Sequence, residues 1–154
     1  MSSPLAANEA RLEFILHAAP AKVWQALVKD TTVWWPQTFY TSAKTKRFVI
    51  EPKLGGMMGE ITGPGEGLVW YNVIGVEKNV SLILLGCLLP PWAGPATSML
   101  RLTLTPEGKD QTKLEINEYT YGVLGDCNTV EGWKQLFGDH FVPHVEKSAK
   151  ARKR

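Results

Sequence analysis

Six consecutive segments with the character of β-strands, separated by short turns, constrain the fold of this chain most strongly. They cover residues 47–52, 57–63, 67–77, 80–89, 98–107 and 112–121. The intervening turns contain residues that favour chain reversal, such as Gly55-Gly56 and Lys78-Asn79. Strands joined by turns this short pair with their sequence neighbours, so the pattern predicts an antiparallel meander.

The residues before the meander predict one further strand and two short helices. Residues 10–18 alternate between apolar and polar side chains, which is typical of a half-buried strand. Pro20 then begins a segment with apolar residues at helical spacing, and proline is favoured in a first helical turn because its missing N–H would be unpaired there. Residues 31–35 form a second short helical turn that ends at Pro36.

The end of the chain, from about residue 128, predicts a long amphipathic helix. Its apolar stripe is spaced i, i+3, i+4, i+8 and i+12 and consists of Trp133, Leu136, Phe137, Phe141 and Val145. Pro143 lies inside this helix and removes the backbone hydrogen bond to Asp139. We therefore expect a kink or break between residues 139 and 143.

Size and composition agree with one folded domain of the α+β class covering residues 1–154. The hydrophobic fraction is 44% and the charged fraction is 21%, which excludes a disordered chain. Residues 147–154 carry five basic side chains and no acidic one, and we expect them to form a flexible basic tail. Without them, 12 basic residues face 15 acidic ones, so the folded body has a net charge of −3 and does not favour nucleic acid.

Membrane insertion, export and disulfide bonding are also not indicated. The most apolar stretch, residues 80–89, is too short to span a bilayer. The first residues lack the basic and apolar regions of a signal peptide, so we expect a cytoplasmic protein. Cys87 and Cys127 are too few and too isolated for a disulfide framework or a zinc site.

A strand, two short helices, six strands and a long helix have a simple physical arrangement. A long antiparallel sheet twists and curves. One helix laid into its concave face buries the apolar stripe but does not fill the hollow, so a cavity is expected. The order of motifs resembles the START-like (SRPBCC) superfamily, also called the Bet v allergen-like or helix-grip group. Within it, the sequence is most similar to the bacterial family related to the heat-shock-protein ATPase activator. The likeness rests on residues 19–27 (APAKVWQAL), 48–51, 54–56, 67–69, 82–86 and 132–136 (GWKQL).

This resemblance implies a curved antiparallel sheet of about seven strands wrapped around a long C-terminal helix, with two short helices after the first strand. It does not imply one activity, because the superfamily includes lipid carriers, hormone receptors, polyketide cyclases, oxygenase domains and co-chaperones. The additional chaperone-binding domain of the eukaryotic-type activators is not seen, which argues against a co-chaperone. A Rieske-type set of Cys and His residues is not seen either, which argues against an oxygenase.

Glu118 is the most informative polar residue. By strand alternation it shares a face with Leu114 and Ile116, which should point toward the helix. A carboxylate in that position must be hydrogen-bonded, paired or hydrated. It could contact a ligand, act as a general acid or base, or only accept a structural hydrogen bond; a register shift near the end of the strand would turn it outward.

Other candidate chemistry is less well supported. His140 and His144 lie one helical turn apart, but no further metal ligand is identifiable, and we expect neither a metal nor a cofactor. Cys127 follows an aspartate that opposes thiolate formation, so it is interpreted as inert. The glycine-rich run at residues 55–59 lacks the ending of a phosphate loop and is interpreted as a turn.

The sequence thus predicts a non-enzymatic protein that binds a small hydrophobic or amphipathic molecule, such as a lipid, between the sheet and the last helix. The predicted wall residues are Met57, Trp70, Leu102, Ile116, Glu118, Trp133, Phe137 and Phe141. One alternative is an enzyme of the polyketide cyclase or dehydratase type that uses Glu118 or a tyrosine as acid or base. Another is a protein-binding adaptor that uses Trp92 and the basic tail. A protein partner is left open, as is the choice between monomer and homodimer.

Overall fold

The computed structural model describes residues 5–92, 94–125 and 129–151. The strands are β1 (Ala6–Leu16), β2 (Arg47–Ile50), β3 (Met57–Gly63), β4 (Glu66–Glu77), β5 (Ser81–Leu88), β6 (Ala96–Pro106) and β7 (Thr112–Gly122). The helical segments are α1 (Pro20–Lys29), α2 (Thr31–Trp34), η1 (Gln37–Phe39), η2 (Pro90–Trp92), α3 (Thr129–Trp133), η3 (Lys134–Phe141) and α4 (Val142–Ala151).

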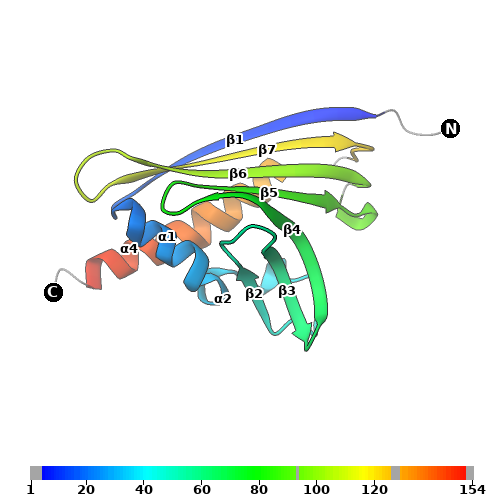
Figure 1. Ribbon diagram of the computed structural model, residues 1–154, viewed down its shortest axis with the longest axis horizontal. Helices are drawn as coiled ribbons and strands as arrows, with labels where there is room; N and C mark the ends of the chain where they lie inside the picture. Colours follow the sequence, from blue (N-terminus) through cyan, green and yellow to red (C-terminus); the bar gives the residue numbers. More distant parts are fainter. Residues whose placement is uncertain (1–4, 93, 126–128, 152–154) are drawn as a thin grey trace.

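The seven strands form one antiparallel sheet in the order β1-β7-β6-β5-β4-β3-β2 (Figure 1). Strands β2 to β7 follow one another as neighbours, which confirms the predicted meander. β1 pairs with β7 over its whole length, from Ala6 opposite Gly122 to Leu16 opposite Thr112. The first and last strands of the chain are therefore adjacent, and β2 lies at the opposite edge of the sheet.

β4 bends, and its bend turns the end of the sheet that contains β2 and β3 toward the helices (Figure 1). Met58 pairs with Tyr71, whereas the next residue, Gly59, pairs with Val69. Trp70 is therefore the extra residue of a β-bulge, and a second irregularity lies farther along β4 on the β5 side. Bulges increase the local twist of a strand and bend it, which explains the curvature at this point.

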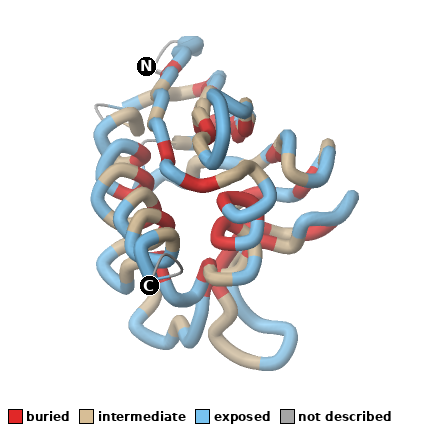
Figure 2. The backbone as a smooth tube through the Cα atoms, turned by 90° about the vertical axis from the view of Figure 1, so that its left-hand side faces the viewer, coloured by how far each residue is buried: buried red, intermediate tan, exposed pale blue. Residues whose placement is uncertain are grey.

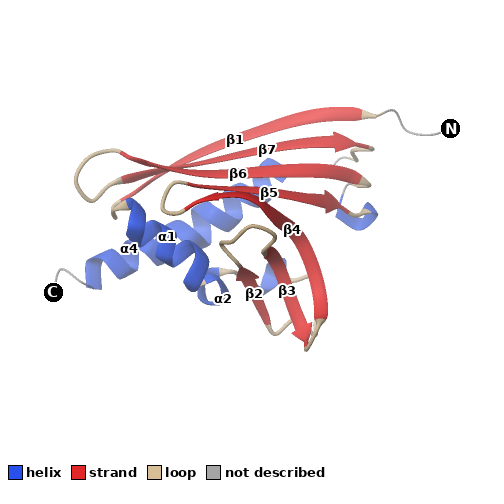
Figure 3. Ribbon diagram, viewed as in Figure 1, coloured by secondary structure: helices blue, strands red, loops and turns tan. Residues whose placement is uncertain are grey.

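The helices lie on the concave side of the sheet (Figure 3), as the sequence analysis expected. α1 begins at Pro20 and contacts β2, β6 and α4. α2 follows directly and contacts β2. Buried residues alternate with more exposed ones along β6 and β7, because only one face of the sheet meets the helices. Figure 2 shows most of the buried positions toward the middle of the molecule and most of the exposed ones around its outside.

The C-terminal helix, formed by α3, η3 and α4 over residues 129–151, is continuous. A kink or break was expected between residues 139 and 143; the helix is not broken there, and a π-helical segment, Lys134–Phe141, leads into this region. In this segment the backbone N–H of Val142 donates to the carbonyl of Phe137, five residues earlier. The wider turn ends next to Pro143, which has no N–H to donate, and it takes up the irregularity without interrupting the helix.

The beginning of the expected flexible tail is helical as well. α4 extends to Ala151, so residues 147–151 continue the C-terminal helix, mostly exposed to solvent. Lysine and alanine are strong helix formers, which allows the helix to continue beyond its apolar stripe. Residues 152–154 lie outside the described residues.

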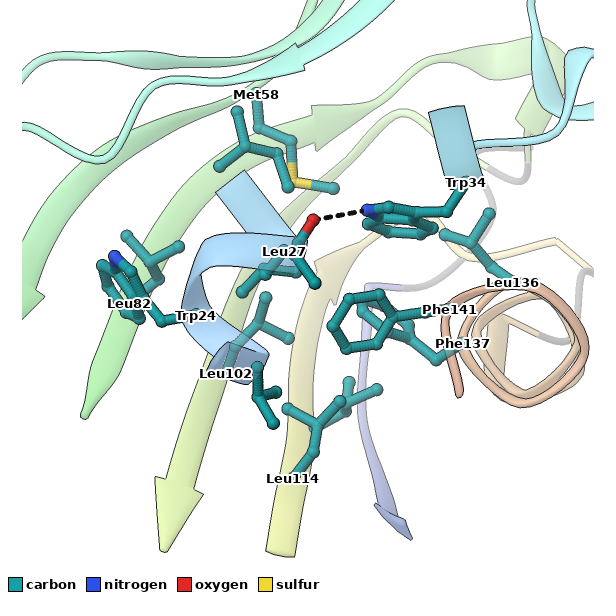
Figure 4. Packing of buried hydrophobic residues seen from close by; sticks show 14 of the residues in the cluster. Trp24, Leu27, Trp34, Met58, Leu82, Leu102, Leu114, Leu136, Phe137 and Phe141 are labelled. Carbon is teal, nitrogen blue, oxygen red and sulfur yellow. Dashed lines mark hydrogen bonds between the residues drawn. The ribbon is translucent and has the colours of Figure 1, made fainter. Parts of the chain in front are cut away.

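The core fills the middle of the concave face between the sheet, α1, α2 and the C-terminal helix (Figure 4). Trp34 of α2 is central to it. Its ring lies 4.8 Å from the ring of Phe141 and 5.7 Å from the ring of Phe137. Its indole N–H donates to the carbonyl of Ala26 at 3.1 Å, so the polar atom of this buried ring is satisfied.

Candidate functional site

A cavity of about 400 Å³ lies between the sheet and the beginning of the C-terminal helix. Its described walls come from four parts of the fold: residues 38–41 in and after η1, residues 68–71 of β4, residues 87–89 at the end of β5 with Trp92 of η2, and Thr129, Gly132, Trp133 and Leu136 of the C-terminal helix. Glu118 of β7 completes the lining. Most of these side chains are aromatic or aliphatic, which is typical of a small-molecule site.

Gly86 on β5 leaves room for the Tyr71 side chain to reach a polar partner on the neighbouring strand. The register places Tyr71 opposite Gly86, and Gly86 opposite Ser98. A Cβ atom added at Gly86 would lie 2.9 Å from Cδ1 of Tyr71 and 1.9 Å from the carbonyl oxygen of Trp70. Glycine therefore lets the tyrosine cross β5, so that its hydroxyl comes within 2.8 Å of Ser98 Oγ on the next strand.

Glu118 lies at the end of this chain of hydrogen bonds, on the inner face of the sheet and only 1% exposed. Its Oε1 accepts from Ser98 Oγ at 2.7 Å and from the Tyr71 hydroxyl at 3.4 Å. Its Oε2 accepts from Nε1 of Trp133 at 2.8 Å. Burial and the nearby negative charge of Glu118 raise the pKa of Tyr71, so the phenol is a hydrogen-bond donor at neutral pH.

A second buried carboxylate, Glu60 of β3, supports the opposite wall. Its Oε1 accepts from the backbone N–H of Thr41 at 2.8 Å and from Thr45 Oγ1 at 2.6 Å. Its Oε2 accepts from Thr41 Oγ1 at 2.7 Å and from Nε1 of Trp70 at 2.8 Å. Burial alone would raise the pKa of Glu60, but the hydrogen bonds from Thr45, Thr41 and Trp70 together outweigh it and lower the pKa.

The bulge at Trp70 explains why two consecutive residues of β4 serve the site. Tyr71 is buried and reaches Ser98, while Trp70 is partly buried and donates to Glu60. The Trp70 ring also lies edge-on to the stacked rings of Trp35 and Phe48, at 5.5 and 5.2 Å. The bulge thus directs a large ring toward the cavity while the core holds its other side.

Three of the predicted wall residues line the cavity: Trp70, Glu118 and Trp133. Leu102, Ile116, Phe137 and Phe141 do not; each is at most 1% exposed and belongs to the packed core. They share a face with the site, but α1 and α2 fill the hollow at their level of the sheet. Met57 does not line the cavity either, because it alternates with buried Met58 and pairs with exposed Asn72 on the outer face.

The sequence analysis missed Glu60 and the walls contributed by loops. The signal for Glu60 was present: it alternates with Met58 and pairs with Phe48, so it lies on the apolar face of β3. Residues 38–41 and Trp92 belong to short turns without a periodic pattern, and only the three-dimensional structure assigns them to the cavity.

His144 and His17 each lie next to one carboxylate. His144 Nε2 lies 3.0 Å from a carboxylate oxygen of Asp30, and His17 Nδ1 lies 3.0 Å from one of Glu146. Within the described ranges, no group of three or more His, Cys, Asp or Glu side chains could hold a metal ion. Cys87 lines the cavity, while Cys127 lies outside the described residues.

Solved structures of other proteins have a similar architecture. No protein-family profile matches the sequence, and neither does any curated protein. Among solved structures, norcoclaurine synthase from Thalictrum flavum, solved with dopamine and hydroxybenzaldehyde, has a TM-score of 0.60 at 15% identity, covering 92% of this chain and 87% of that one. The Bet v 1 allergen Ara h 8.0201 has a TM-score of 0.60 at 12% identity, with 95% and 99% covered. An HSP90 activator from Plasmodium falciparum has a TM-score of 0.58 at 12% identity, with 92% and 96% covered.

The chain has the Bet v 1-like helix-grip fold. The match to nearly the whole length of these structures confirms the curved seven-stranded sheet, the long C-terminal helix and the short helices after β1. At these identities the likeness concerns the fold alone. Proteins with this fold include ligand binders, enzymes and activators of other proteins. None of the helices in the described ranges has the length and apolar character needed to cross a membrane.

Proposed function

We propose that this protein binds a small hydrophobic or amphipathic molecule in the cavity between the sheet and the C-terminal helix. The observation that supports this most is the combination of an apolar cavity of about 400 Å³ with one buried, hydrogen-bonded carboxylate in its lining. Apolar walls provide affinity for the body of a ligand, and a few fixed polar groups orient it. A cytoplasmic location remains part of this proposal.

The most direct experiment is native mass spectrometry of protein purified from its own host. A small molecule that remains bound after purification would support the proposal and give the mass of the ligand. Because the bound molecule stabilises only the folded state, its removal should also lower the melting temperature.

Gly132 offers a way to fill the cavity without disturbing the fold. It lies in α3 and lines the cavity, and a Cβ atom added there would meet no atom of the described residues within 4 Å outside its own helix and chain neighbours. We expect Gly132→Leu to place its side chain in the open space and weaken binding of the neutral dye phenylnaphthylamine by roughly tenfold or more, as expected when a subsite for several carbon atoms is lost. Fluorescence titration measures this change.

Gly132→Ala is the matched control. Both variants replace a helical glycine and should raise the free energy of unfolding by about 0.5–1 kcal/mol, but alanine adds only one methyl group to the cavity. Dye affinity should therefore remain close to that of the wild type in Gly132→Ala. Equal affinities in Gly132→Leu and the wild type would count against this cavity as the binding site.

The alternative of a cyclase- or dehydratase-like enzyme draws on the Tyr71–Ser98–Glu118 chain of hydrogen bonds. Glu118→Gln separates the two functions because it keeps the shape of the side chain and removes proton transfer. A binding protein should lose at most roughly tenfold in affinity for a neutral ligand. An enzyme that uses Glu118 as acid or base should lose about 10²–10⁴-fold in rate while it still binds.

The adaptor alternative relied on an exposed Trp92 and on the basic tail. Trp92 is 40% exposed, and its remaining surface contributes to the cavity wall. The residue thus fits the entrance of a ligand site, and the proposal assigns it there.

A further inference from the structure

The one charged side chain among the described lining residues of the cavity is acidic. Among the described lining residues, Glu118 is the one carboxylate, and there is no lysine, arginine or histidine. Glu60 lies directly behind the wall, because two of its hydrogen-bond donors, Thr41 and Trp70, line the cavity. A ligand in this space therefore meets one buried carboxylate, has a second one behind the wall, and meets no basic side chain among the described lining residues.

Among the described residues, no cationic side chain pairs with either carboxylate. The donors to Glu60 and Glu118 are backbone N–H, hydroxyl and indole groups, all of them neutral. The ion pairs found among the described residues involve other acidic side chains. In a site shielded from water, negative charge that is only hydrogen-bonded produces a potential that attracts cations and repels anions.

The two carboxylates differ in their capacity for a further partner. Both oxygens of Glu60 accept two hydrogen bonds each, so Glu60 is saturated. Oε2 of Glu118 accepts from Trp133, its one donor among the described residues, and keeps a second lone pair. Glu118 can therefore accept a hydrogen bond from a ligand, whereas Glu60 contributes only its charge.

Aromatic rings in the wall add to the same preference. Tyr40, Trp70, Trp92 and Trp133 all line the cavity. The faces of such rings carry partial negative charge and attract cationic groups within about 6 Å, tryptophan most strongly.

From these features we infer that the ligand of this cavity carries a protonated amine on an apolar or aromatic body, and that fatty-acid-like carboxylates are excluded. The inference rests on the proposed function and specifies its ligand class. The ammonium group donates to Oε2 of Glu118, the rings contact the body of the ligand, and Glu60 increases the negative potential from behind the wall.

Three probes with the same ring system test this inference by isothermal titration calorimetry on the full-length protein. Naphthylmethylamine is cationic at pH 7, naphthylmethanol is neutral and naphthoate is anionic. We expect the wild type to bind the amine at least roughly tenfold more tightly than the alcohol, and the alcohol more tightly than the carboxylate, because a hydrogen bond to a charged group exceeds a neutral one by about one factor of ten.

Glu118→Gln should reduce the preference for the amine to less than roughly threefold while the affinity for the alcohol changes little. Glu77→Gln, at the exposed end of the same β4 that supplies Trp70, removes one charge away from the cavity and should leave the preference intact. Equal binding of all three probes to the wild type would overturn the amine preference and leave the cavity as a binding site. If the wild type binds none of the three probes, both the proposed function and this inference are overturned. Because these outcomes are measured on the wild type, they test both proposals even if Glu118→Gln does not fold.

Discussion

Trp133→Ala is expected to lower the free energy of unfolding by about 3–5 kcal/mol, the range for removing a large aromatic side chain from a core. The ring is 8% exposed and packs 6.1 Å from the ring of Phe137 and 6.3 Å from that of Tyr71. Its N–H is also the donor to Oε2 of Glu118. Urea unfolding followed by circular dichroism measures the loss.

Two further variants separate the causes of this loss. Trp133→Phe keeps much of the ring but removes the donor to Glu118, so we expect a smaller loss of about 1–3 kcal/mol. Trp92→Ala removes a ring of the same type from the cavity wall, but that ring is 40% exposed, and a loss below about 1 kcal/mol is expected. A loss of that small size for Trp133→Ala would show that Trp133 belongs to the cavity wall alone and does not support the core.

Glu60→Ala is expected to lower the free energy of unfolding by about 2–4 kcal/mol. The substitution leaves the backbone N–H of Thr41, the hydroxyls of Thr41 and Thr45 and the indole N–H of Trp70 without their acceptor. Each buried donor without a partner costs about 1–3 kcal/mol, although relaxation of the hydroxyl groups recovers part of this. The same variant should weaken ligand binding, because Thr41 and Trp70 would no longer be held in the wall.

The contribution of Glu60 should also depend on pH in a defined direction. Hydrogen bonds lower its pKa in the folded protein, so the stabilisation is present above the pKa of the unfolded chain, about 4.3, and is lost as the pH falls through the lower folded value. Glu60→Gln removes this group, so its stability should decline less than that of the wild type between those two values.

Glu66→Gln, at the exposed start of β4, is the matched control for a lost carboxylate and should follow the wild-type pH profile. Unfolding curves recorded at a series of pH values compare the three proteins. A decline of Glu60→Gln that parallels the wild type would contradict the lowered pKa of Glu60.

Glu118 and Glu60 show what strand alternation can and cannot predict about a site. Alternation with Leu114 and Ile116 placed Glu118 on the inner face, and the structure buries it there. The same rule applied to Met58 would have placed Glu60 on the inner face of β3. Neither pattern identifies the partners, because Ser98, Trp133 and Thr41 come from other elements.

The sequence by itself determined the strands, the main helices and the inner faces of β7 and the C-terminal helix. Short turns between alternating segments leave only neighbour-to-neighbour antiparallel pairing, and the apolar stripe of the C-terminal helix requires a concave surface to cover it. β3 accordingly has the bounds that its residues predict, and α1 begins at Pro20.

Only the tertiary structure decided where the core ends and the cavity begins. Leu102 and Trp70 both face the helices, yet Leu102 is buried where α1 packs on β6, while the bulge in β4 directs Trp70 to the cavity. Periodicity shows which side of a strand or helix is apolar. It does not show how much of that side a neighbouring helix covers. The division of one apolar face into packed core and open site depends on those lengths and on the bend of the sheet, which are properties of the assembled chain.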